Sequence, residues 1–105
     1  MQRLRSGLLA SLIACAATSS YALTDAQAES AITAALKDMN CAFIVKEDMN
    51  KFEQKMAASL DIPFDVLTNI DSEEYDVMDE AMQRMMLNVE VVFDPNTTEL
   101  SLVKC

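Results

Sequence analysis

The placement of three cysteines constrains this chain more than any other feature of its sequence. Cys15 lies in an apolar stretch near the start, Cys41 follows a stretch with helical spacing, and Cys105 is the final residue. If the apolar stretch is an export signal, two thiols remain in an oxidising compartment, where such a pair normally closes. Cys41 is also expected to follow a helix C-terminus, where the helix dipole disfavours a reactive thiolate. The sequence therefore predicts a structural disulfide between Cys41 and Cys105.

Residues 1–22 have the three parts of a secretory signal peptide. Arg3 and Arg5 supply a basic start, and the apolar run 8–17 is too short to span a bilayer. The small residues that follow predict cleavage near Ala22. We therefore expect residues 23–105 to form one small domain in the periplasm or outside the cell.

A second interpretation of the same stretch leads to a membrane anchor. The sequence Leu12-Ile13-Ala14-Cys15 resembles the lipidation box of bacterial lipoproteins. Lipid on Cys15 would tether the domain to a membrane through a short linker. The expected membrane association depends entirely on this modification.

Charge and composition exclude several classes of function. Because Arg3 and Arg5 leave with the signal, six basic residues face 17 acidic ones, and the mature net charge is about −11. Such a surface repels nucleic acid, so no nucleic-acid partner is expected. The chain has no histidine, which removes Ser-His and Cys-His catalysis. We expect no enzyme, no catalytic residues and no cofactor.

The periodicity of apolar residues predicts helices followed by a β-hairpin. Thr24 and Gln27 form a capping box, and Asn40 is suited to end the first helix. An acidic cap at Asp71 begins the last helix, whose apolar stripe includes Tyr75, the methionines and Val89. The expected helices lie at 25–39, 45–60 and 71–87, with a short helix or turn at 64–70. A short extended run is expected at 42–45, and the hairpin strands at 89–93 and 100–103.

These elements define an α+β class, with three to four short helices and a terminal hairpin that covers one end of a helical core. The order of elements is similar to that of winged-helix domains. The resemblance covers the mature domain, rests on element order alone and implies no DNA binding, because the charge has the wrong sign.

The methionines are the candidate binding residues. Four of them lie in the last helix: Met78, Met82, Met85 and Met86. Thioethers bind Cu(I), but the same residues share an apolar stripe, and methionine fills irregular cores well. Core packing is the first interpretation. The alternatives are a soft-metal site and a methionine-lined groove for an apolar ligand or partner.

The function expected from the sequence is that of an exported, acidic, non-enzymatic module that interacts with an unknown protein or serves within an envelope complex. Small size, negative charge and the missing catalytic groups motivate this expectation. A small-ligand or Cu(I) binder is the alternative.

Overall fold

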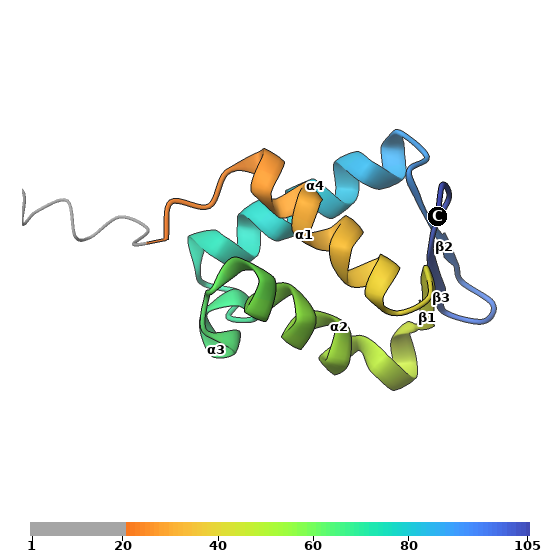
Figure 1. The fold of residues 1–105 in the computed structure, drawn as a ribbon, viewed down its shortest axis with the longest axis horizontal. Coiled ribbons are helices and arrows are strands. Elements are labelled where there is room, and N and C mark those ends of the chain that lie inside the picture. Colours follow the sequence, from red (N-terminus) through yellow and green to blue (C-terminus); the bar gives the residue numbers. More distant parts are fainter. Residues whose placement is uncertain (1–20) are drawn as a thin grey trace, which may run out of the picture.

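The computed structural model describes residues 21–105 and shows four helices and three strands in this part of the chain. The predicted signal peptide up to residue 20, with Cys15, lies outside the described residues. The elements are α1 (Asp25–Asp38), β1 (Ala42–Ile44), α2 (Val45–Leu60), α3 (Phe64–Leu67), α4 (Glu73–Leu87), β2 (Val91–Asp94) and β3 (Glu99–Leu102). In Figure 1 the helices form one body and the sheet closes one end of it. The α+β class expected from the sequence is confirmed.

Helix α1 is the central element of the helical body. The Thr24 side chain accepts a hydrogen bond from the Gln27 amide, and the Gln27 side chain accepts one from the Thr24 amide, as predicted. The helix packs against both α2 and α4, so its apolar stripe is covered from two sides. The buried members of that stripe are Ala28, Ala31, Ile32, Ala35 and Leu36. Three of these five residues are alanine, whose small side chain lets the neighbouring helices approach closely.

The sheet contains one strand more than the predicted hairpin. Its order is β1-β3-β2, with both pairs antiparallel. Phe43 and Phe93 lie on either side of Leu100 in the register. Because side chains alternate across a sheet, these three share one face, and the burial of Phe43 and Leu100 shows that this face covers the helical core. The sequence marked 42–45 as extended but did not predict its pairing with β3.

The disulfide lies at one end of the antiparallel β1–β3 pairing. Cys41 precedes β1, Cys105 follows β3, and their Cα atoms lie 5.9 Å apart, within the range that a disulfide spans. The Leu102 amide also donates a hydrogen bond to the Cys41 carbonyl at 2.8 Å. The predicted clasp therefore links the end of the first helix to the last strand.

Three helices end in the same way without a glycine. At the end of α1, the amide of Cys41 bonds to the carbonyl of Leu36, and Asn40 has φ 64°. The same arrangement places Asp61 at φ 55° after α2 and Val89 at φ 58° after α4. This is the Schellman motif, in which a left-handed residue closes the last turn. Asn40 was predicted to end α1, and asparagine adopts this conformation at little steric cost. Valine in the same conformation is sterically strained.

Replacing Val89 with glycine should stabilise the protein. A β-branched residue at positive φ carries a steric cost that glycine lacks, and Val89 is 63% exposed, so little packing is lost. We expect Val89→Gly to raise the free energy of unfolding by about 1 kcal/mol, measured by urea denaturation. Val92→Gly is the matched control: it removes valine from a strand and should be destabilising. A loss of stability in Val89→Gly would contradict this account of the helix end.

The structure corrects three details around α3 and α4. Ser72, not Asp71, caps α4, because its hydroxyl accepts a hydrogen bond from the Tyr75 amide at 3.0 Å and so satisfies the first turn. Helix α3 stops at Leu67, which leaves Ile70 exposed. The buried face of α4 also differs from the predicted apolar stripe. Ala81 is fully buried, whereas Val89 lies beyond the helix and is exposed.

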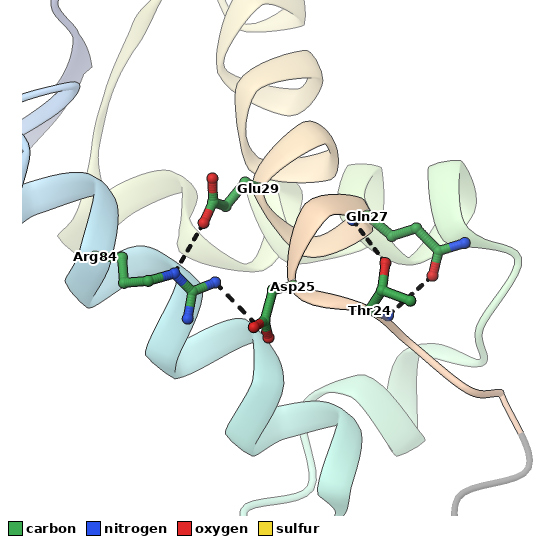
Figure 2. A network of polar contacts seen from close by, with 5 residues as sticks. All are labelled: Thr24, Asp25, Gln27, Glu29 and Arg84. Carbon is green, nitrogen blue, oxygen red and sulfur yellow. Dashed lines mark hydrogen bonds and ion pairs between the residues drawn. The ribbon is translucent and has the colours of Figure 1, made fainter.

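Arg84 binds α4 to the start of α1 (Figure 2). Its Nε donates a hydrogen bond to Glu29 Oε2 at 2.9 Å, and its Nη2 lies 3.8 Å from Asp25 Oδ1. Glu80 and Arg84 lie four residues apart on α4, a spacing that predicts a pair along the same helix, but the guanidinium instead contacts α1. Asp25 lies in the first turn of α1, where the helix dipole also favours negative charge. The hydrogen bond to Glu29 raises the pKa of Arg84, so its charge persists at all ordinary pH values.

Removing the Arg84 charge should weaken the contact between α1 and α4. We expect Arg84→Met, which keeps an apolar stem of similar length, to unfold at a lower urea concentration than the parent protein. The difference should shrink at high salt, because the side chain is about one third exposed and its ion pairs are screened. Lys46→Met, on an exposed face of α2, should have a smaller effect. Equal effects of the two substitutions would show that net charge, rather than the contact with α1, is what matters.

Candidate functional site: a methionine groove between α2 and α4

A small groove lies between α2 and α4 and is the candidate binding site. Its volume is about 140 Å³, close to that of an engineered cavity known to hold one benzene molecule. Ile32 of α1 lies among its lining residues, and α2, α4 and the segment around α3 supply the remainder. Those residues are Met49, Phe52, Glu53 and Met56 of α2, Leu67 and Thr68, and Tyr75, Met78, Asp79 and Met82 of α4.

Four methionines from two helices line this groove. Met56 and Met78 are buried, and Met49 and Met82 are half-buried. Met49 and Met56 are about two turns apart on α2, and Met78 and Met82 are about one turn apart on α4. Each pair therefore lies on one face of its helix. The thioether side chain is flexible and polarisable, so a surface built from it can adapt to differently shaped apolar groups.

The charged residues that line the groove are both acidic. Glu53 on α2 is half-buried, and Asp79 on α4 is exposed. Burial raises the pKa of Glu53 above its ordinary value, because the surrounding protein removes water from the carboxylate. A positive group brought beside Glu53 would restore the lost stabilisation of its charge. The groove therefore combines apolar walls with two carboxylates that lack a basic neighbour in the lining.

The four methionines singled out from the sequence divide between different places. Met78 and Met82 line the groove. Met85 is buried and lines a separate hollow beside Thr33 and Glu90, and Met86 is 38% exposed. The structure thus joins Met78 and Met82 to two methionines of α2 rather than to Met85 and Met86.

Sequence reasoning missed the contribution of α2. Met49 and Met56 lie at helical spacing in the segment 45–60, which was expected to be a helix, and Glu53 follows Met49 by one turn. A signal was therefore present: two helices, each carrying methionines at helical spacing, predict a shared methionine surface if they pack together. Which helices face each other depends on the tertiary arrangement, and the spacing alone does not contain it.

Ionic contacts elsewhere on α2 serve the fold. Lys55 Nζ donates a hydrogen bond to Asp38 Oδ2 at the end of α1, and this bond holds the pKa of Asp38 below its ordinary range. Asp38 is exposed and Lys55 is half-buried, and both lie outside the groove lining. The pair connects α2 to α1.

Among residues 21–105, no helix is both long and apolar enough to cross a bilayer. The same residues contain no group of three or more histidine, cysteine, aspartate or glutamate side chains placed to hold a metal ion. Comparison of the chain with protein families, curated proteins and solved structures finds no match.

Proposed function

We propose that this protein is an exported, non-enzymatic module that binds another protein through the α2–α4 groove. The observation that carries the proposal is the size and chemistry of the groove. Ligand and substrate sites usually occupy about 300–1,000 Å³, whereas this groove holds about 140 Å³. That volume accommodates one large apolar side chain, which is how a partner protein anchors in a small pocket.

Export is supported by the chemistry of the cysteines. The Cys41–Cys105 pair stands at disulfide distance, and disulfides persist mainly in oxidising compartments. The signal-like residues 1–22 point to the same location. We place the protein in the periplasm or outside the cell, released by cleavage near Ala22 or, in the alternative, anchored through lipid on Cys15.

Non-reducing mass spectrometry of the exported protein tests its processing. We expect a chain that begins after Ala22 and is two hydrogens lighter than its fully reduced form, because the disulfide is closed. A chain that begins at a lipid-modified Cys15 would show that the protein is anchored to a membrane rather than released. An uncleaved chain with free thiols would overturn the export proposal.

Site-specific crosslinking tests the interaction. A photoreactive amino acid at Met82 would lie in the groove, and the same amino acid at Glu47 would lie on an exposed part of α2. We expect a defined partner to crosslink from Met82 but not from Glu47. The purified partner should then shift the NMR signals of the groove methionine methyls. Crosslinking that is absent or equal at both positions would overturn the proposal.

A soft-metal site is the second candidate, and the convergence of Met49, Met56, Met78 and Met82 favours it, because thioethers are ligands for Cu(I). Under this alternative the exported protein would hold stoichiometric Cu(I) and lose it in a Met78→Leu/Met82→Leu variant. Leucine preserves apolar volume, so the fold should survive the change. Retention of the metal in the variant would show that Met78 and Met82 are not its ligands.

A further inference from the structure

The charges that line the groove indicate the chemistry of its occupant. Glu53 and Asp79 are the charged lining residues, one on each flanking helix, so a bound group meets negative charge from two sides. The mature protein as a whole is also strongly acidic, which attracts basic partners over distances of about a Debye length. An acidic or phosphorylated partner would be repelled by the same charges.

The size of the groove limits the apolar part of that occupant. A volume of about 140 Å³ is filled by a single ring of the size of benzene or a comparable aliphatic group. A wholly apolar helix would need a longer channel, with anchors repeated at successive turns. One anchor side chain inserted between Met49 and Met82, with basic residues on each side of it, fits both the volume and the charges.

From these two features we infer that the groove binds a lysine- or arginine-rich segment of another protein, with one large apolar side chain inserted among the methionines. This inference rests on the proposed function and specifies its partner. The anchor supplies burial of apolar surface. The flanking cations pair with Glu53 and Asp79, which determine the charge preference and speed the encounter.

A set of three peptides tests the inference on the full chain expressed for export and purified from the periplasmic fraction. The first has one phenylalanine flanked by lysines in an alanine background. The second replaces the phenylalanine with alanine, and the third replaces the lysines with glutamates. Methionines labelled with ¹³C at the methyl group report the binding position, because groove and non-groove methionines occur in the same molecule.

We expect the first peptide to shift the methyl signals of the four groove methionines and to leave those of Met39 and Met86 in place. The second and third peptides should bind at least roughly tenfold more weakly, because each lacks one of the two recognised features. Binding of the first peptide should also weaken as salt is raised.

Two variants separate groove charge from overall charge. Glu53→Gln/Asp79→Asn should weaken binding of the first peptide by roughly tenfold. Glu47→Gln/Asp76→Asn removes the same number of charges from exposed positions on the same two helices, outside the groove lining, and should leave binding nearly unchanged. The peptide series on the parent protein keeps the test valid even if a variant folds poorly.

Several outcomes would overturn the inference. Equal binding of the alanine peptide would show that surface charge alone is recognised, and equal binding of the glutamate peptide would show that the carboxylates do not select the partner. Groove shifts produced by dodecyltrimethylammonium and by none of the peptides would assign the site to a small cationic amphiphile. In each case a partner crosslinked from Met82 would still support a protein-binding function, so the two proposals fail separately.

Discussion

Replacing both Cys41 and Cys105 with serine should reduce the free energy of unfolding by about 4 kcal/mol. The bond closes a loop with a sequence separation of 64 residues, and the chain-entropy relation for a loop of that length gives about 4 kcal/mol. A domain of this size has a total stability of about 4–12 kcal/mol, so the variant should be close to unfolding at physiological temperature. Urea denaturation followed by circular dichroism measures the difference.

The reduced parent protein is the control for this experiment. It keeps both sulfur atoms and loses only the bond, so it should match the double-serine variant closely. If the variant retains the denaturation midpoint of the oxidised parent, the β1–β3 pairing and the core hold the two segments together without the bond. A stable reduced parent beside an unstable variant would instead assign the loss to the serine side chains.

Phe52→Ala should be comparably destabilising, with a loss of about 3–5 kcal/mol. Phe52 is fully buried, and its ring stacks on that of Phe43 with centroids 4.7 Å apart and planes inclined by 28°. This contact joins α2 to the first strand, so truncation removes both burial and the connection between the helical body and the sheet. The measurement is again the urea midpoint, with thermal unfolding as a second reading.

Two substitutions calibrate this prediction. Phe52→Leu keeps most of the apolar volume and should lose less than about 1.5 kcal/mol. Phe64→Ala removes the same ring from a half-buried position, where the surrounding protein provides fewer contacts, and should fall between the two. Equal losses from Phe52→Ala and Phe64→Ala would contradict the central position assigned to Phe52.

Local signals predicted most of the secondary structure because they act within a few residues. The Thr24–Gln27 box and the left-handed Asn40 each determine an element boundary through hydrogen bonds or backbone geometry nearby in the chain. The cap of α4 was assigned one residue too early, because Asp71 and Ser72 are both good caps. Which of the two residues caps the helix depends on the Ser72 hydroxyl, which also donates hydrogen bonds to the carbonyls of Val66 and Asn69 across the preceding turn.

The features that were not predicted are those that join distant segments. The pairing of Phe43 with Leu100 and the reach of Arg84 to Glu29 both connect residues more than fifty positions apart, and no local pattern specifies such partners. The candidate groove belongs to this class. Its α4 methionines were recognised as candidates from the sequence, whereas Met49 and Met56 became part of the same surface only when α2 and α4 packed against α1.

The methionine lining of the groove also gives the surface a chemical sensitivity that leucine would not. An oxidant that reaches half-buried Met49 or Met82 converts the thioether to a sulfoxide, which is polar and chiral. An apolar anchor would then meet a polar wall, and the oxidised groove would hold it less tightly. Repair of the sulfoxide by methionine sulfoxide reductases would restore the original surface, so the affinity of this groove would follow the balance between oxidant exposure and repair.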